Sequence, residues 1–69
     1  MKVWYFPDTD TLYIELINVP SVESAEVMEG VVFDYDEKGK VVGIEIEHFT
    51  ERFSGKPAEI PLTFTNFLA

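Results

Sequence analysis

The sequence contains no cysteine and little positive charge, and each absence excludes a class of function. Without cysteine the chain has no disulfide bond, no thiolate ligand for zinc and no thiol nucleophile. Five Lys and Arg residues stand against thirteen Asp and Glu residues, for a formal net charge of −8. Nucleic acids bind basic surfaces that release counterions, and anionic lipid headgroups repel an acidic protein. We therefore expect neither a nucleic acid nor a membrane as a partner.

Long hydrophobic runs are absent as well. No window approaches the roughly 18 apolar residues of a membrane-spanning helix, and the apolar run near the N-terminus is too short for a signal peptide. We therefore expect a cytoplasmic protein. Because 69 residues are fewer than one typical domain contains, we predict a single small domain over residues 1–69. The C-terminal residues 56–69 include several apolar side chains and are a possible docking tail of this domain.

Alternation of apolar and polar residues is the dominant pattern in what the sequence does contain. A period of two is typical of β-strands, because successive side chains of a strand point to opposite faces of the sheet. Short segments rich in proline, asparagine, aspartate and glycine separate the alternating runs, and these residue types favour turns. The pattern predicts strands over residues 2–6, 11–17 and 22–28, and a hairpin within residues 30–48.

The pattern changes near the C-terminal end of this hairpin. Phe49 and Phe53 stand four residues apart, and a glycine and a proline follow, as at the end of a short helix. We predict this helix over residues 49–54. Because every connection is short, the predicted fold is mainly β: an antiparallel meander sheet of about five short strands with one short helix near the C-terminus.

The hairpin within residues 30–48 has a predictable register, because a slip by one residue would bury its acidic side chains. A common apolar face sets three cross-strand pairs: Tyr35–Val42, Phe33–Ile44 and Val31–Ile46. Gly39 then occupies a tip position where a positive φ is required. The loop has two residues, 38–39, or four residues, 37–40.

Acidic side chains gather on the opposite face of this hairpin, namely Asp34, Asp36, Glu45 and Glu47. Asp34, Asp36 and Glu45 nearly satisfy the spacing of a calcium-binding loop. However, Lys38 occupies a ligand position, and the flanking residues alternate as in strands, whereas an EF-hand has two flanking helices. A hairpin tip with solvated acids is therefore the favoured interpretation. The alternative is a weak divalent-metal site formed by Asp34, Asp36 and Glu45.

Exposed carboxylates are poor candidates for acid–base chemistry, which needs burial to separate their pKa values. We therefore predict no catalytic residue, no cofactor and no enzymatic activity. His48 shares its parity with Ile44 and Ile46, which predicts a partly buried, hydrogen-bonded imidazole rather than a metal ligand. Asp10 is expected to stabilise the first turn. Gly43, inside a strand, indicates a bulge or a close approach of another group to its backbone.

Two segments resemble a known family. Residues 5–14 read YFPDTDTLYI, and residues 30–46 read GVVFDYDEKGKVVGIEI. Together they resemble the small bacterial and archaeal proteins of domain of unknown function family 2283, and the resemblance covers roughly residues 1–48. The family usually has Asp where Phe6 stands and an apolar residue where Glu47 stands. The resemblance implies a small β-rich fold, carries no established activity, and suggests an antitoxin-like binding role, since some relatives are encoded beside small toxin-like proteins.

The chain has more aromatic and apolar side chains than a domain of this size can bury. The interface candidates are Trp4, Phe6, Tyr13, Phe64 and Phe67. This surplus predicts a homo-oligomer, in the simplest case a homodimer, that acts as a protein-binding or assembly module. Its acidic face would attract a basic protein partner. The alternative is a domain that binds a small ligand or a divalent metal through the acidic hairpin face.

Overall fold

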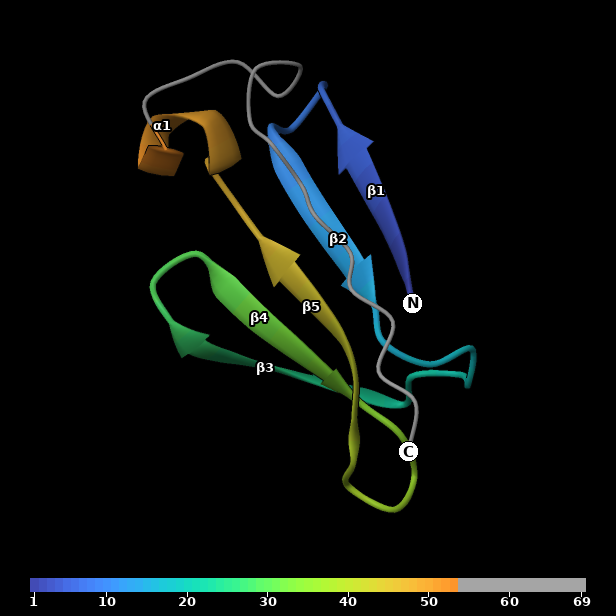
Figure 1. The fold of residues 1–69 in the computed structure, drawn as a ribbon. Helices are drawn as coiled ribbons and strands as arrows, with labels where there is room; N and C mark the ends of the chain where they lie inside the picture. The colour runs from blue at the N-terminus through green and yellow to red at the C-terminus, as the bar shows by residue number, and fades with distance from the viewer. Residues whose placement is uncertain (54–69) are drawn as a thin grey trace.

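Five strands and one helix form the part of the chain that the computed structural model describes, residues 1–53 (Figure 1). The elements are β1 (Lys2–Phe6), β2 (Thr11–Glu15), β3 (Glu23–Met28), β4 (Val31–Tyr35), β5 (Val41–Ile46) and α1 (Phe49–Phe53). All strand pairs are antiparallel and belong to one sheet. The predicted mainly β class, with about five short strands and a short helix after them, is confirmed. The predicted tail over residues 56–69, with Phe64 and Phe67, lies outside the described residues.

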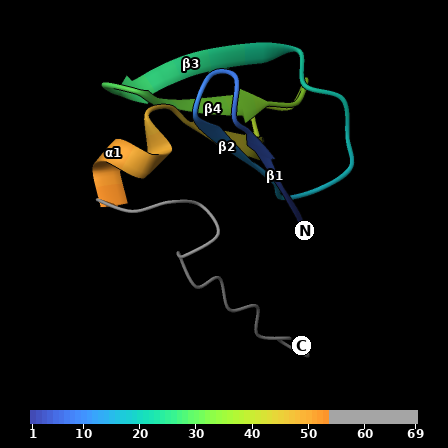
Figure 2. The same cartoon turned by 90° about the horizontal axis from the view of Figure 1, so that it is seen from above.

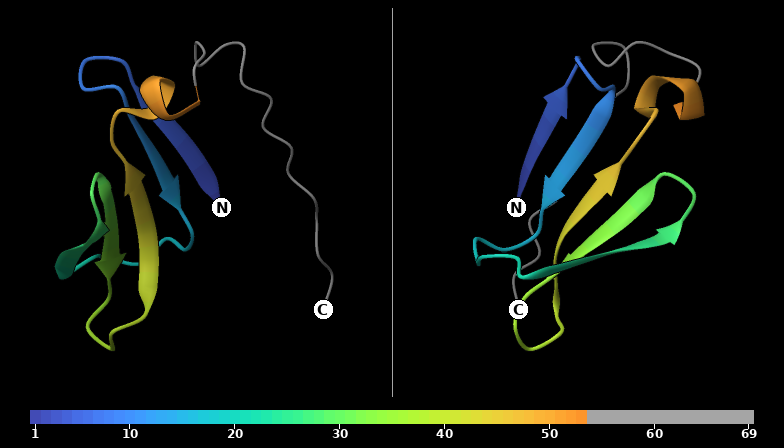
Figure 3. Two further views of the ribbon diagram at one scale, coloured as in Figure 1. Left: turned by 90° about the vertical axis from the view of Figure 1, so that its left-hand side faces the viewer. Right: turned by 180° about the vertical axis from the view of Figure 1, so that it is seen from behind.

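The strands lie in the order β1-β2-β5-β4-β3, with β1 and β3 at the two edges (Figure 3). Consecutive strands pair within β1–β2 and within β3–β4–β5, but β5 also pairs with β2. The connection over residues 16–22 therefore crosses from β2, inside the sheet, to β3 at the far edge. In a simple meander, β3 would instead lie next to β2. Pairing of β2 with β5 sets Leu12 opposite Ile46 and Ile14 opposite Ile44, which joins two apolar strand faces.

The register of the β4–β5 hairpin follows the prediction at two positions, where Val31 lies opposite Ile46 and Phe33 lies opposite Ile44. The third predicted pair is wrong: Tyr35 lies opposite Val41, because the register shifts between Asp34 and Tyr35. The extra residue is Val42, which is only 2% exposed. Its carbonyl oxygen accepts hydrogen bonds from the backbone N–H groups of residues 16 and 17, so the bulge fastens the crossing connection to the hairpin.

The tip of this hairpin is a three-residue loop over residues 37–39 rather than a loop of two or four. The Asp36 backbone N–H donates to the Lys40 carbonyl oxygen at 2.9 Å, and the Gly39 N–H donates to the Asp36 carbonyl oxygen at 3.0 Å. Gly39 has a φ of 80°, as predicted for the tip glycine. A turn followed by a glycine with positive φ matches the right-handed twist of the flanking strands.

The sheet has one apolar face and one polar face. The apolar face carries Val3, Tyr5, Leu12, Ile14, Val31, Phe33, Ile44 and Ile46, which the register places side by side. Helix α1 lies on one side of the sheet (Figure 2), and its Phe49 is 3% exposed with its ring centroid 6.3 Å from that of Tyr5. Within residues 1–53, the buried hydrophobic residues are Leu12, Val42 and Phe49. No helix of this part is long and apolar enough to cross a membrane.

Asp10 fastens the start of α1 to the turn between β1 and β2. Its carboxylate accepts hydrogen bonds from the Tyr5 hydroxyl at 2.7 Å, the Thr50 hydroxyl at 2.8 Å and the Thr50 backbone N–H at 3.2 Å. Its carbonyl oxygen accepts the Phe49 N–H at 2.9 Å. The predicted turn residue therefore also holds the helix. This second role could not be predicted from local pattern, because Asp10 and Thr50 lie 40 residues apart.

Arg52 holds the other side of α1 against the sheet. Its guanidinium donates to the Glu47 carbonyl oxygen at 2.8 Å and to the Glu29 carbonyl oxygen. Gly30 makes this contact possible, because a Cβ built there would lie 3.3 Å from Arg52 Cζ, with Nη2 closer still. Gly30 also has a φ of 78°, so two independent requirements favour glycine at this position.

The predicted burial of His48 is wrong. Its side chain is 66% exposed, and Nδ1 lies 3.7 Å from Glu51 Oε2. His48 has a φ of 53°, which turns the chain from β5 into α1. The strand alternation ends at Ile46, the last residue of β5, so the parity argument does not reach position 48.

Candidate functional site

A row of polar side chains crosses four adjacent strands on the polar face of the sheet. Ser24 of β3, Asp34 of β4, Glu45 of β5 and Tyr13 of β2 form this group, which we term the carboxyl cluster. Ser24 lies opposite Asp34, and Tyr13 lies opposite Glu45. Asp34 also lies opposite Gly43, two residues from Glu45 on the same strand face. The register therefore brings two carboxyl groups, a phenol and a hydroxyl together.

Asp34 is buried in this cluster, with 5% of its surface exposed. The Ser24 hydroxyl donates a hydrogen bond to Asp34 Oδ1. No buried side-chain nitrogen or oxygen within residues 1–53 lacks a hydrogen-bond partner. A buried carboxyl group is stable only where such partners replace water. The neighbouring strands therefore make the burial of Asp34 possible.

Two groups of the cluster, Glu45 and Tyr13, have raised pKa values. Burial raises the pKa of Glu45, and the negative charge of Asp34, a hydrogen bond with Asp34 and the charge of Glu47 raise it further. Burial, followed by the charges of Asp34 and Glu45, also raises the pKa of the Tyr13 phenol. Adjacent carboxyl groups in a partly dry site disfavour a second negative charge. The cluster is thus suited to hold a proton or to accept positive charge.

Gly43 lets the Tyr13 ring lie across β5. A Cβ built at Gly43 would be 2.8 Å from Tyr13 Cζ and 3.2 Å from Cε2, and the hydroxyl is closer still. Residue 43 is buried and its pairing lies next to the register shift in the hairpin. Of the two alternatives expected at this glycine, the close approach is confirmed, whereas the bulge lies at the neighbouring residue, Val42. Tyr13 reaches Asp34 because residue 43 has no side chain in the way.

The acidic face was predicted to be solvent-exposed, and this prediction is wrong for Asp34. The alternation of the hairpin placed Asp34 and Glu45 on the correct face but gave no information about Ser24 and Tyr13, which cover them. Those two residues come from strands on either side of the hairpin.

The structure does not bring Asp36 to this cluster. Asp36 Oδ1 accepts hydrogen bonds from the backbone N–H groups of Lys38 and Lys40, both at 2.9 Å. The Lys40 backbone hydrogen bond lowers the pKa of the Asp36 carboxyl, and the Lys38 backbone hydrogen bond and the charges of both lysines act in the same direction. Asp36 stabilises the hairpin tip, as the solvated-tip interpretation requires. Residues 1–53 contain no group of three or more His, Cys, Asp or Glu side chains arranged to hold a metal ion.

An open hollow of ≈ 470 Å³ adjoins the carboxyl cluster. Its lining includes Tyr13 and Glu45 from the cluster, and the exposed His48 and Phe6 at its rim. Glu45 and Tyr13 therefore stand between buried Asp34 and this open surface hollow.

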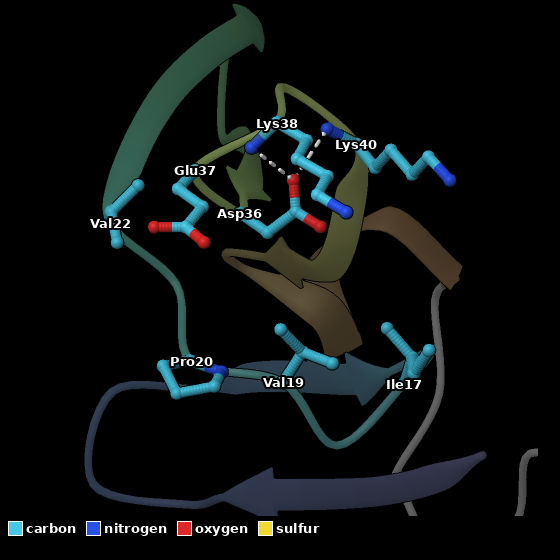
Figure 4. A pocket seen from close by; sticks show the side chains of 8 residues that line it. All are labelled: Ile17, Val19, Pro20, Val22, Asp36, Glu37, Lys38 and Lys40. Atoms are coloured by element: carbon cyan, nitrogen blue, oxygen red, sulfur yellow. Dashed lines mark hydrogen bonds between the residues drawn. The ribbon is translucent and has the colours of Figure 1, made fainter.

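A second hollow of ≈ 440 Å³ separates the hairpin tip from the crossing connection (Figure 4). Ile17, Val19 and Val22 line it from the connection, with 54%, 39% and 65% of their surfaces exposed. Lys38 and Lys40 line it from the tip. Sequence reasoning missed this hollow, because only the crossing connection brings these two segments together.

Aromatic side chains lie exposed on the edge strand β1. Trp4 and Phe6 are each 49% exposed. Trp4 lies opposite Tyr13 and Phe6 opposite Thr11, so both point to the polar face. The structure therefore groups three of the predicted interface residues, although Tyr13 is half-buried and belongs to the carboxyl cluster.

These features define a small, mainly β domain built on one antiparallel sheet with a carboxyl cluster at its centre. The chain belongs to the family described as "Protein of unknown function (DUF2283)", which matches residues 2–49. The match covers all five strands and every residue of the carboxyl cluster. It confirms the resemblance drawn from the two sequence segments. No curated protein and no solved structure matches the chain.

Proposed function

We propose that the protein is a non-enzymatic assembly module that forms a homodimer and binds a protein partner. The observation that carries this proposal is the amount of apolar surface left exposed in residues 1–53. Three hydrophobic residues are buried there, against eight large exposed ones: Met1, Trp4, Phe6, Ile17, Val19, Val22, Val27 and Met28. Trp4 and Phe6 lie on one face of β1, and Ile17, Val19 and Val22 line one hollow. Grouped apolar side chains of this kind are typical of surfaces that another protein covers.

The charge of the chain indicates which partner beyond a second copy would bind. A net charge of −8 attracts a basic protein by electrostatic steering and raises its association rate at low salt. The acidic side chains on β3, Glu23 and Glu26, are exposed and available for such steering. Neutralisation of a small basic protein, as an antitoxin does, is the most specific form of this proposal.

Sedimentation equilibrium of the purified full chain tests the assembly proposal. A concentration series is measured in EDTA and repeated with added calcium, magnesium, manganese or zinc. A dimer that forms equally well in EDTA supports the proposal. A single-chain mass at every concentration contradicts it, and association that needs a divalent ion favours the second candidate function below.

The second candidate function is the binding of a small ligand or a divalent ion at the carboxyl cluster. It is favoured by one specific observation, namely that Glu45 and Tyr13 connect buried Asp34 to the ≈ 470 Å³ hollow. Calorimetric titration with the same four ions tests it. If the cluster binds an ion, Glu45→Gln abolishes binding, whereas Asp36→Asn leaves it intact because Asp36 lies at the hairpin tip. No heat of binding in the unmodified chain contradicts metal binding.

A further inference from the structure

In the sheet formed by residues 1–53, the two edge strands differ in charge and regularity. β1 contains no acidic residue, has Lys2 at its start and pairs regularly with β2 over all five of its residues. β3 contains Glu23 and Glu26, and its register shifts between Glu26 and Met28. A sheet edge presents unpaired backbone N–H and C=O groups that can pair with another strand, and charges or irregular pairing at an edge prevent this. β3 is protected in both ways, whereas β1 has one charge, Lys2 at its end, and pairs regularly along its length.

Net charge restricts where two copies of this chain can meet. At −8 per chain, copies repel each other wherever their acidic surfaces approach. Because β1 carries no carboxylate, a second β1 can approach it without placing two acidic side chains opposite each other. If two β3 strands paired, Glu23 and Glu26 of one copy would lie near Glu23 and Glu26 of the other. Like charges in cross-strand positions destabilise a pair.

We propose that β1 pairs antiparallel with β1 of a second copy, about a two-fold axis at Trp4. This inference rests on the proposed assembly function and names its interface. Trp4 is the central residue of Lys2–Phe6, so an axis there pairs the whole strand. Lys2 then lies opposite the partner's Phe6, and Val3 opposite the partner's Tyr5. The product is one continuous ten-stranded sheet.

The side chains of β1 fit this arrangement on both faces. On the polar face, the half-exposed Trp4 contacts its counterpart across the axis, and Phe6 lies beside it on the same strand face. On the apolar face, the partly exposed Val3 and Tyr5 continue the apolar row of one sheet into that of the other. A contact of β1 with β3 of the next copy would be head-to-tail and would extend into a ring or a fibre, whereas the β1–β1 contact closes as a dimer.

Single cysteines test this interface, because the chain contains none of its own. Opposed residues of an antiparallel pair have Cα atoms about 4.5–5.5 Å apart, within the range that a disulfide bridges. Trp4→Cys is therefore expected to oxidise to a covalent dimer. Ala25→Cys, in the middle of the exposed strand β3, is the matched control and is expected to remain monomeric on a non-reducing gel.

A charge variant provides a second readout that does not depend on disulfide geometry. Trp4→Glu and Val27→Glu add the same charge to the two edge strands at positions that are 49% and 47% exposed. Trp4→Glu is expected to raise the dimer dissociation constant at least ~10-fold, as loss of a central aromatic contact does. Val27→Glu is expected to change it less than ~3-fold, since surface charges away from an interface have weak effects. Circular dichroism checks that both variants keep the sheet.

The outcomes separate this inference from the proposed function. If the unmodified chain dimerises but Ala25→Cys cross-links in place of Trp4→Cys, or Trp4→Glu weakens the dimer no more than Val27→Glu, the interface lies elsewhere. The inference is then wrong and the assembly proposal stands. If the unmodified chain sediments as a monomer at all concentrations, the homodimer and this inference are both wrong.

Discussion

Replacing Gly43 by alanine tests how tightly the carboxyl cluster is packed. The new Cβ would lie 2.8 Å from Tyr13 Cζ and 3.2 Å from Cε2, too close for atoms in ordinary contact. The contact involves the ring and not the flexible end of a long side chain, so the Tyr13 side chain must shift and move its hydroxyl away from Asp34. Overpacking of this kind costs about 1–3 kcal/mol, and we expect Gly43→Ala to lower the free energy of unfolding by about 2 kcal/mol.

Urea denaturation of a double-mutant cycle measures this cost. In a Tyr13→Val background the ring is absent, and alanine at position 43 meets no such obstacle. Alanine is favoured over glycine inside a strand by roughly 0.5–1 kcal/mol. Gly43→Ala is therefore expected to destabilise the native protein but to stabilise the Tyr13→Val variant. The change of sign identifies the ring contact as the cause.

Two results would refute this reasoning. The first is a cost below about 0.5 kcal/mol for Gly43→Ala in the native protein, the size of an ordinary surface substitution. The second is an equal cost in both backgrounds, which would mean that the alanine disturbs the bulge rather than Tyr13.

Three further predictions concern the pKa shifts and the second required glycine. Burial and its acidic neighbours raise the pKa of Glu45 above the usual 4.5, so its contribution to stability is present below pH 4.5 and is lost as the pH rises through the raised pKa. Glu45→Gln should thus increase the unfolding free energy at pH 7 by a few tenths of a kcal/mol, a figure reduced for solvent screening, as measured by urea denaturation. The pKa of Asp10 is lowered, chiefly by the hydrogen bond from Tyr5. Its contribution to stability is present above the usual pKa of 3.8 and is lost as the pH falls through the lowered pKa, so Asp10→Asn should flatten the fall of Tm below about pH 4; an unchanged fall would contradict this. Gly30→Ala should cost more than Gly39→Ala in urea denaturation, since both have φ near 80° but only Gly30 faces Arg52. The Arg52 guanidinium can move aside, so the extra cost at Gly30 is the weakening of its hydrogen bonds to the Glu47 and Glu29 carbonyl oxygens. We expect about 1 kcal/mol for Gly39→Ala and about 2 kcal/mol for Gly30→Ala, and equal costs would count against the Arg52 contact.

The local parts of the fold could be predicted from the sequence because short-range patterns determine them. Alternation of apolar and polar residues predicted where the strands lie, and Gly39 predicted the hairpin tip, where its φ is positive in the structure. The bulge at Val42 was not predicted, because its cause is distant: its carbonyl group binds the crossing connection from β2. The pairing of β2 with β5 was not predicted either, since alternation shows which residues share a face and not which strands are neighbours.

The carboxyl cluster shows the same division between local and distant information. Alternation placed Asp34 and Glu45 on one face of the hairpin, and Gly43 marked a close approach to the backbone. Burial of Asp34 depends on Ser24 and Tyr13, which reach it from strands outside the hairpin. Their identity follows from the strand order, and strand order is set by packing between apolar faces rather than by local sequence.

Fluorescence of Trp4 tests the central claim, dimerisation through β1, most directly. Trp4 is the single tryptophan of the chain, and in the isolated chain its side chain stands half-exposed at the proposed axis. When the protein concentration is raised in a buffer with EDTA, the emission of Trp4 should shift to shorter wavelength as the dimer forms. The midpoint of this shift should equal the midpoint of the mass change in sedimentation. Emission that stays constant while the mass doubles would contradict the claim, because the indole would then lie outside the interface.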